Sequence, residues 1–369
     1  MKIFAFGSSI VSSYWNGAAT YYRGMYKYLA RQGHSITFAE PEAYGRQQHR
    51  DGDDFSYVRS LVYKPGTGLN EMLAMAREAD VVVKHSGIGV DDEELELRVL
   101  ETQTHAVVCF WDVDSPATIA RMQGNAADAF RRAMPRYDAV LTYGGGPEVR
   151  RDYVGFGARQ YYSIYNGLDP ETHHPVPADA SLACDVAFLG NRLPDREARV
   201  DELFLRAATL APGKSFLLGG EGWEGKPLPG NVRWIGHVPT AEHNRVNCSA
   251  ALVMNINRAS MASSGFSPPT RIFEVAGSGT PLLCDEWPGI DDVFEPGREI
   301  LVVRSAEDVV RALDRYTRTE LRQIGERFLA RALRDHTYAQ RAAQASRAFE
   351  ALRAGRAAGD VTRAEGGGA

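Results

Sequence analysis

Short apolar runs rich in Val, Ile, Leu and Phe alternate along the chain with longer stretches in which apolar residues recur at helical spacing. The opening shows the alternation clearly. Lys2 to Phe6 predicts a buried strand and Gly7-Ser8-Ser9 a loop, and an amphipathic helix that Gly33 ends leads to a second strand at 35–39. Such alternation is typical of α/β proteins, in which helices cover both faces of a parallel sheet.

The same pattern continues to the last quarter of the chain. It predicts further strands at 57–63, 80–84, 106–111, 139–142, 161–165, 184–189, 215–218, 232–235, 251–254, 281–284 and 300–303. A stretch with three prolines, residues 166–178, interrupts the rhythm and predicts a linker. We therefore expect two doubly wound, Rossmann-like domains, at 1–172 and 173–335. A C-terminal helix at 336–355 could pack back across the domains, and a disordered tail is expected at 356–369.

Composition narrows the class of protein. The chain is 44% hydrophobic and 24% charged, which favours a folded protein, and its net charge of -5 gives no overall attraction for nucleic acid or anionic lipid. No apolar run approaches the roughly 18 residues of a membrane helix, and four widely spaced cysteines suit reduced thiols. We expect a cytoplasmic protein. Between residues 304 and 356 twelve arginines face seven acids, so a nucleic acid or membrane surface is not excluded there, although a solvated face is commoner.

Ligands of open parallel sheets gather at the carboxyl ends of the strands. In the first half this position holds His85, Asp112 and Asp114, residue types that can act as a general base in catalysis. Each has a structural alternative, since Asp114 could equally cap the following helix and His85 could be a buried polar residue. No group of residues has metal-ligand spacing, and we interpret His173, His174 and His237 as structural.

A segment of the second half, residues 263–281, is rich in Ser, Gly and Pro. Pro268 or Pro269 could begin a helix with Ser267 as its cap, and Gly277 to Gly279 could end it. The free amides of such a helix attract phosphate. Arg271 in the first turn could reinforce an anion site, and Glu274 could accept hydrogen bonds from a ribose diol. An ordinary capped helix with a solvated Arg and Glu is an equally good interpretation.

Five motifs in order along the chain resemble those of one enzyme family. They are Trp111-Asp-Val-Asp-Ser-Pro116, Tyr137-Asp-Ala-Val-Leu-Thr-Tyr143 leading to Asn166-Gly-Leu-Asp-Pro170, Asp185 to Arg196, Arg271-Ile-Phe-Glu274 to Pro281, and Phe294-Glu-Pro-Gly297. Together they resemble the group 1 (family 4-like) glycosyltransferases, and within these most of all the CgeB-like branch.

The resemblance implies a GT-B fold, in which two facing Rossmann-like domains enclose a cleft. It implies that a nucleoside-diphosphate sugar binds the C-terminal domain and an acceptor the N-terminal one, with no bound metal and no cofactor. By this resemblance Glu274 would bind the ribose and His85 the sugar, while the remaining donor-site residues would be Gly190, Arg192, Arg196, Asn257, Arg258, Gly265, Phe266 and Arg271. Of these, Arg192, Arg196 and Arg271 would hold the diphosphate, and the amides of Gly265 and Phe266 would approach the phosphates or the sugar.

One position departs from the family pattern. A second glutamate is expected eight residues before the ribose-binding one, and Phe266 stands there. The contact to the donor sugar is therefore unassigned, and both stereochemical outcomes stay open. We expect a retaining glycosyltransferase with an unidentified acceptor; the alternatives are a GT-B-fold sugar-nucleotide epimerase and a non-catalytic nucleotide-binding or scaffold protein.

Overall fold

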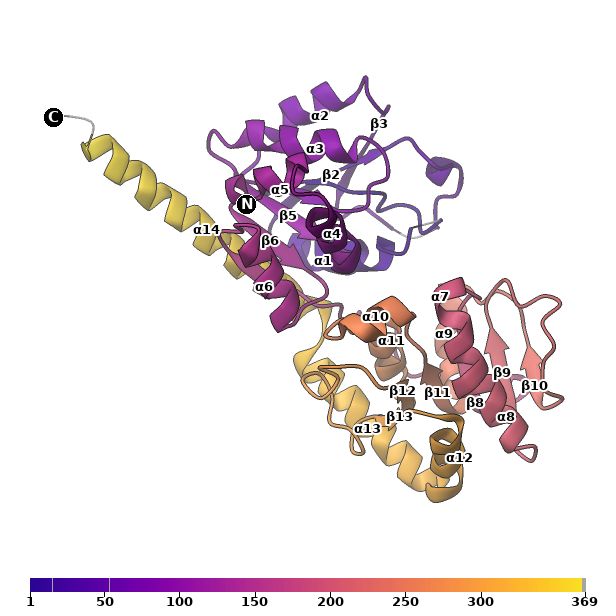
Figure 1. The fold of residues 1–369 in the computed structure, drawn as a ribbon. Coiled ribbons are helices and arrows are strands. Elements are labelled where there is room, and N and C mark those ends of the chain that lie inside the picture. The colour runs from indigo at the N-terminus through magenta and orange to yellow at the C-terminus, as the bar shows by residue number, and fades with distance from the viewer. Residues whose placement is uncertain (15, 53, 367–369) are drawn as a thin grey trace. The chain divides into compact units, whose positions relative to one another are not determined.

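A computed structural model describes residues 1–366 apart from positions 15 and 53, with side chains up to residue 357. The chain forms two compact units (Figure 1). One comprises Met1–Tyr165 together with Tyr338–Ala369, and the other comprises Asn166–Thr337. The first unit is therefore built from two separate stretches of sequence.

Seven parallel strands form the sheet of the first unit, in the order β3-β2-β1-β4-β5-β6-β7. The strands are β1 (Lys2–Phe6), β2 (Ser35–Pro41), β3 (Arg59–Tyr63), β4 (Val81–His85), β5 (Val107–Asp112), β6 (Ala139–Thr142) and β7 (Tyr161–Ser163). The helices are α1 (Ala19–Arg31), α2 (Leu69–Ala76), α3 (Asp92–Arg98), α4 (Ser115–Gly124), α5 (Ala129–Ala133), α6 (Pro147–Gly155) and α14 (Tyr338–Gly366). Since β1 pairs with both β2 and β4, the strand order reverses at β1.

Helices cover both faces of this sheet, as the sequence predicts. One hydrophobic cluster packs α2 to α6 against Val82 and Phe110, and the other packs α1 and α14 against Val83 and Trp111. Val82 and Val83 are neighbours on β4 and point to opposite faces of the sheet, as do Phe110 and Trp111 on β5. All four are buried, so both faces of the sheet are covered. This burial on two sides explains why the strands are continuous apolar runs rather than alternating ones.

The last helix of the chain belongs to the first unit. Figure 1 shows α14, in yellow, among elements from the start of the sequence. Tyr338 begins α14 and packs on α1 at Gly24, where a Cβ atom would lie only 2.4 Å from the Tyr338 ring. About three turns further along, Phe349 is fully buried and its ring lies 6.2 Å from that of Trp111. The C-terminal helix therefore completes the core of the N-terminal sheet.

Arginines of α14 pair with this unit's own acids. Arg353 forms an ion pair with Asp80 at 2.9 Å, and Arg356 forms one with Asp138 at 3.0 Å while donating to the Ala106 carbonyl at 2.7 Å. Asp80, Ala106 and Asp138 lie directly before β4, β5 and β6. Part of the predicted basic face is thus engaged in docking the helix at the amino ends of the strands.

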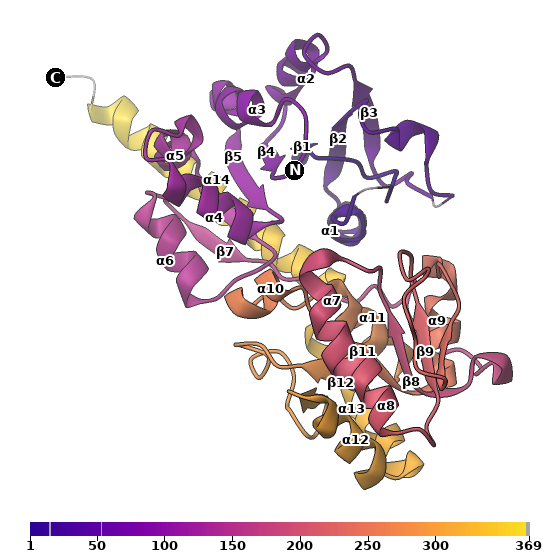
Figure 2. The same ribbon diagram turned by 45° about the vertical axis from the view of Figure 1, so that its right-hand side comes forward.

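Six parallel strands form the sheet of the second unit, in the order β10-β9-β8-β11-β12-β13 (Figure 1). Figure 2 shows its central strands β9, β8, β11 and β12 from another side. The strands are β8 (Cys184–Leu189), β9 (Phe216–Gly219), β10 (Val232–Trp234), β11 (Ala250–Asn255), β12 (Leu282–Asp285) and β13 (Leu301–Val303). The helices are α7 (Pro194–Val200), α8 (Arg206–Leu210), which a π-helical turn at Asp201–Leu205 joins to α7, α9 (Thr240–Ser249), α10 (Ala259–Ser264), α11 (Thr270–Ser278), α12 (Ala306–Arg315) and α13 (Arg318–Asp335). Two hydrophobic clusters again fill the two faces of the sheet.

All the predicted strands are present, with ends shifted by no more than two residues. The limits of the two units differ more from the expected ones. The N-terminal stretch of the first unit ends at Tyr165 rather than at 172, and the second unit ends at Thr337 rather than at 335. The predicted linker packs on the second unit, because Leu168 is buried in its core and Asn166 donates to the Pro268 carbonyl at 3.2 Å. The expected tail, 356–369, also differs: α14 continues to Gly366, and 367–369 lie outside the described residues.

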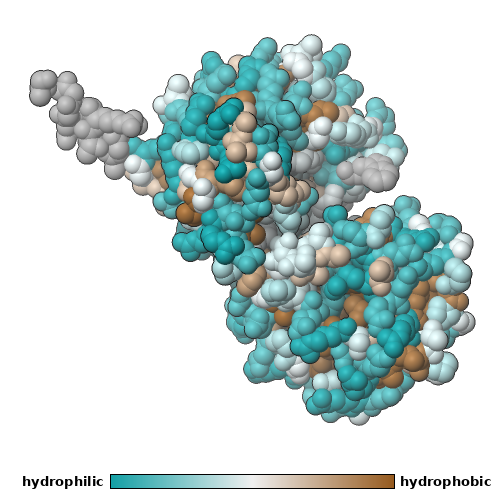
Figure 3. All heavy atoms as spheres, viewed as in Figure 1, coloured by the Kyte–Doolittle hydropathy of each residue, from teal (hydrophilic) through white to brown (hydrophobic). Residues whose placement is uncertain are grey.

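The described helices include none that is both long and apolar enough to cross a bilayer. Figure 3 shows that the visible face of each unit is mainly hydrophilic, with hydrophobic residues scattered over it.

Replacing Phe349 with alanine should destabilise the first unit by about 3–5 kcal/mol, because a large cavity would open beside Trp111. Urea unfolding followed by tryptophan fluorescence measures the change. The matched control is Leu333→Ala on α13, where the side chain is exposed and we expect a change within about 0.5 kcal/mol. Equal stabilities of Phe349→Ala and the wild type would contradict the docking of α14.

Candidate functional site

His85 ends β4 inside the core of the first unit. Its side chain is 1% exposed, its Nε2 atom lies 2.6 Å from the Tyr26 hydroxyl, and the rings of Tyr22 and Trp111 flank it at 4.5 and 5.5 Å. Burial, with a smaller contribution from the charge of Lys84, lowers the pKa of His85 to about 3. The predicted contact between His85 and a sugar is not possible from this position, and its alternative as a buried polar residue describes it better.

Asp112 is fully buried at the end of β5 and is saturated with hydrogen bonds. One carboxylate oxygen accepts from the Ser86 hydroxyl at 2.6 Å and from the Thr118 hydroxyl at 3.1 Å, and the other accepts from the Tyr153 hydroxyl. These hydrogen bonds join the end of β4 to α4 and α6. Because its oxygens already accept them, the Asp112 carboxylate is not placed to take a proton from an acceptor substrate. The structure therefore assigns Asp112 to the scaffold rather than to catalysis.

Asp114 is exposed at the N-cap position of α4, but its side chain makes no hydrogen bond to the helix amides. The predicted capping contact is absent there. Of the three residues proposed as bases, Asp114 alone is on the surface.

The helix α11 of the second unit carries Arg271 and Glu274. It begins at Thr270, with Pro269 as its N-cap and no side-chain cap, so the capping role predicted for Ser267 is wrong. Its predicted end is confirmed, because Gly279 follows in the left-handed conformation with φ of 70°. The Arg271 Nη1 and Glu274 Oε2 atoms form an ion pair of 2.9 Å one turn apart.

Two histidines complete the surroundings of Glu274. His243 of α9 has its Nδ1 atom 3.7 Å from Glu274 Oε2 and 3.3 Å from Arg271 Nη1, and His173 of the linker stacks on the His243 ring. Burial and the charge of Arg271 lower the pKa of His243 to about 3, so the imidazole is neutral. Burial, the largest single effect, raises the pKa of Glu274, but Arg271, His173 and His243 together outweigh it and hold the pKa at about 2. Glu274 is therefore a largely buried, ionised acceptor.

The sequence analysis missed both histidines as neighbours of this site. His173 is three residues from the nearest motif residue, Pro170, but nothing local shows that the linker turns back towards α11. His243 lies on a polar helix more than thirty residues before Glu274 without any recognisable spacing. Their pairing depends on the packing of α9 and the linker on α11, which only the three-dimensional fold brings about.

Arg196 lies at the carboxyl end of β8 near two other arginines. The charges of Arg271 and Arg258, together with burial as the largest cause, lower the pKa of Arg196. Gly190 makes room for it, since a Cβ atom there would lie 2.9 Å from the Arg196 guanidinium, which also donates to the Asn191 carbonyl. The buried Nε atom of Arg196 has no hydrogen-bond partner among the described residues. The structure thus gathers three of the predicted donor-site arginines.

Asn257 adjoins this cluster through Asp285, a residue absent from the predicted site. Asp285 is 1% exposed and accepts hydrogen bonds from the backbone N–H of Asn257 at 3.0 Å and from the Arg199 guanidinium at 2.6 Å. The Asn257 Nδ2 atom is buried, and the described part of the chain offers it no acceptor. Since buried donors normally have partners, this donor is available to a ligand.

Arg192, Gly265 and Phe266 are engaged elsewhere. Arg192 pairs with Glu197 at 2.7 Å, away from the arginine cluster. The amide of Gly265 donates to the Met261 carbonyl at 3.0 Å, and that of Phe266 donates to the Pro288 carbonyl at 2.7 Å. The predicted approach of these two amides to phosphate is therefore contradicted. Phe266 has a φ of 48°, an uncommon conformation for a non-glycine residue.

A known protein family matches the part of the chain that holds Arg271 and Glu274. Residues 196–347 match a protein family described as glycosyl transferase-like; the match lies mostly in the second unit and covers less than half of the chain. No curated protein sequence matches the chain.

Several solved structures resemble the chain over nearly its whole length. HepE from Anabaena in complex with UDP-glucose is 14% identical, with 95% of this chain and 100% of that chain covered and a TM-score of 0.66. Sucrose-phosphate synthase from Thermosynechococcus elongatus is 15% identical, with 96% and 100% covered and a TM-score of 0.67. A glycosyltransferase from Rickettsia africae is 10% identical, with 95% and 98% covered and a TM-score of 0.64. These similarities confirm the GT-B fold.

The burial of His85 makes the stability of the first unit depend on pH. The pKa of about 3 in the folded protein lies below the ordinary value of about 6.5, so the unfolded chain binds more protons between these values. The contribution of neutral His85 is complete above pH 6.5 and is lost as the pH falls, at about 1.4 kcal/mol per pH unit. We expect the stability gap between wild type and His85→Gln, measured by urea unfolding, to narrow at this rate from pH 6 to pH 4. A gap that stays constant would show that His85 is not buried as described.

Proposed function

We propose that the protein is a glycosyltransferase that uses a nucleoside-diphosphate sugar as donor, bound by the second unit. The observation that carries the proposal is the ionised Glu274 on α11, beside a cluster of arginines at the carboxyl ends of the strands. Glu274 retains 11% exposure of its side chain, and its Oε2 atom takes both contacts described above. Its Oε1 atom makes no hydrogen bond within the described residues, so it can accept from a ribose diol.

Arg196 and Arg271 supply charge for a diphosphate, and Arg258, which pairs with Asp195 at 2.7 Å, lies near enough to affect Arg196. Arginine binds phosphate oxygens with two parallel hydrogen bonds, each charge-assisted bond being worth about 1.5–3 kcal/mol. The unpartnered Nε of Arg196 and Nδ2 of Asn257 add free hydrogen-bond donors to the same region. We assign the departing diphosphate to this cluster and leave Arg192 outside it.

We propose that transfer needs no metal ion. His173, His243 and Glu274 have ligand atoms within 4.8 Å of one another, a spacing that could hold a cation. The Arg271 guanidinium, however, lies 2.9 Å from Glu274 and 3.3 Å from His243, so a second positive charge there would be repelled. We assign this cluster the role of keeping Glu274 charged and oriented.

A retaining outcome fits the first unit better than inversion does. Inversion requires a base that takes the acceptor proton, and both His85 and Asp112 are buried and engaged. Retention without a dedicated base makes no such demand. Asp114 stays available as a base should the enzyme invert.

Two other functions remain alternatives, an epimerase that uses the same donor and a nucleotide-binding scaffold for which Phe266 is the best argument. A cytoplasmic location, suggested by the sequence, and membership of the CgeB-like branch belong to the proposal as well.

Thermal-shift measurements with nucleoside diphosphates test the donor site. At a hundred times its Kd a ligand stabilises the folded protein by about 2.7 kcal/mol, and we expect one diphosphate to do so for the wild type. Glu274→Gln should weaken that binding about 10- to 100-fold, because a charged acceptor for the ribose is lost. Glu326→Ala, an exposed acid on α13, serves as the control. Indifference of the wild type to every nucleotide would reject the proposal.

Turnover of the best-binding donor tests the chemistry. We expect hydrolysis or transfer to proceed undiminished in EDTA, and NMR of the first-formed product to show the anomeric configuration of the donor. Activity that EDTA abolishes and Mg²⁺ or Mn²⁺ restores would contradict metal independence. A product of opposite configuration would show inversion, and conversion of the donor into an epimer would identify the alternative enzyme class.

A further inference from the structure

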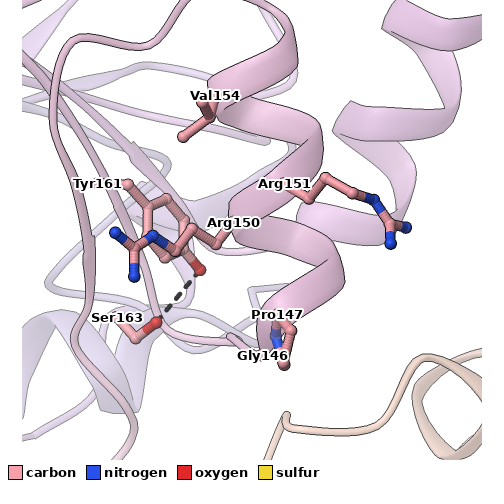
Figure 4. Close-up of a pocket in the computed structure, with 7 residues that line it drawn as sticks. All are labelled: Gly146, Pro147, Arg150, Arg151, Val154, Tyr161 and Ser163. Carbon is pink, nitrogen blue, oxygen red and sulfur yellow. Dashed lines mark hydrogen bonds between the residues drawn. The ribbon is translucent and has the colours of Figure 1, made fainter.

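A hollow of about 700 Å³ opens in the first unit between α6 and β7, and we call it the α6–β7 hollow. It is lined by Gly146, Pro147, Arg150, Arg151, Val154, Tyr161 and Ser163 (Figure 4). These residues follow or belong to the last strands of the sheet, with Gly146 and Pro147 coming after β6 and Ser163 ending β7. The hollow is large enough for a sugar-sized ligand.

Arg150 is the cation of this hollow. It is exposed, and no acidic side chain among the described residues pairs with it. Figure 4 shows its guanidinium beside Tyr161 and Ser163. Arg151, the next residue, points the opposite way in the same view, and its charge lies 4.0 Å from Glu148 of its own helix. One arginine of the pair is therefore balanced locally and the other is not.

Hydroxyl groups stand next to the Arg150 charge. The Ser163 hydroxyl donates to the Tyr161 hydroxyl at 3.2 Å, and the latter lies 2.9 Å from the Thr142 hydroxyl. Burial raises the pKa of Tyr161 against the opposing effects of Ser163, Thr142 and Arg150, so the phenol is neutral. Gly145 permits this arrangement, because a Cβ atom there would lie 2.7 Å from the Ser163 hydroxyl.

The rest of the lining is apolar. Val154 is 54% exposed, and with Pro147 and the face of the Tyr161 ring it offers a surface on which a sugar ring can pack. An unpaired guanidinium, adjacent hydroxyls and an apolar wall suit a small molecule with one negatively charged end.

We propose that the α6–β7 hollow binds an acceptor substrate that carries a phosphate or carboxylate group, with Arg150 and Ser163 contacting the anion. The proposal rests on the proposed glycosyltransferase function and adds the charge of the acceptor to it. The donor residues described above all lie in the other unit, so the two sites can be tested separately.

Three ligands with the same sugar ring test the proposal on the full chain: glucose 6-phosphate, glucuronate and glucose. We expect isothermal titration or ligand-observed NMR to detect binding of one of the two anions and at least tenfold weaker binding of neutral glucose. The preferred anion then distinguishes phosphate from carboxylate. Equal affinity for all three, or binding of none, would overturn the proposal.

Variants locate the binding. Arg150→Gln should weaken binding of the preferred anion at least tenfold, whereas Arg132→Gln, the same change in charge at an exposed position of α5 outside the lining, should leave it within about twofold. Equal losses in both variants, or no loss in Arg150→Gln, would overturn the assignment.

The nucleoside-diphosphate thermal shift keeps this result separate from the proposed function. Arg150→Gln should retain the full shift of the wild type. If the shift is present but the anions fail to discriminate, the acceptor proposal alone is wrong; if the shift is absent in the wild type as well, the donor assignment fails first.

Discussion

The ion pair between Arg271 and Glu274 is the interaction on which the chemistry of the second unit depends. A carboxylate taken out of water normally becomes protonated, and Glu274 stays charged because the effects of Arg271, His173 and His243 together outweigh burial. Arg271 makes the largest of these three contributions, from one turn earlier on the same helix. The linker and α9 thus both act on one residue of α11, which explains why the linker packs with the second unit.

The two sheets use their carboxyl ends differently. In the first unit His85 and Asp112 are inside the protein, where they join neighbouring elements through hydrogen bonds, and the accessible polar groups are displaced to the edge at β7. In the second unit the carboxyl ends hold arginines, an unpartnered amide and the ionised glutamate. Similar topology therefore gives buried, hydrogen-bonded polar groups at the strand ends of one sheet and charged, partly unpartnered groups at those of the other.

The fold could be predicted from the sequence because strands buried on both faces are continuous apolar runs, and Gly33 and Gly279 end helices where left-handed backbone is needed. The pairing of Arg271 with Glu274 could be predicted as well, because residues three positions apart are neighbours on one face of a helix. The contacts of His243, Asp285 and the Phe266 amide were not, because each depends on elements far apart in the chain. The same holds for His85 and Asp112, whose strand-end positions say nothing of the aromatic rings and hydroxyls that enclose them.

The return of α14 to the N-terminal sheet has a consequence for synthesis of the protein on the ribosome. Asn166–Thr337 is a continuous stretch, so the second unit has all its residues before translation ends. The first unit, although most of it precedes the second in the sequence, lacks the side chains of Tyr338 and Phe349 until α14 emerges. Trp111 and the Gly24 face of α1 are left uncovered in the nascent chain until then, so the unit that begins earlier completes its native packing later.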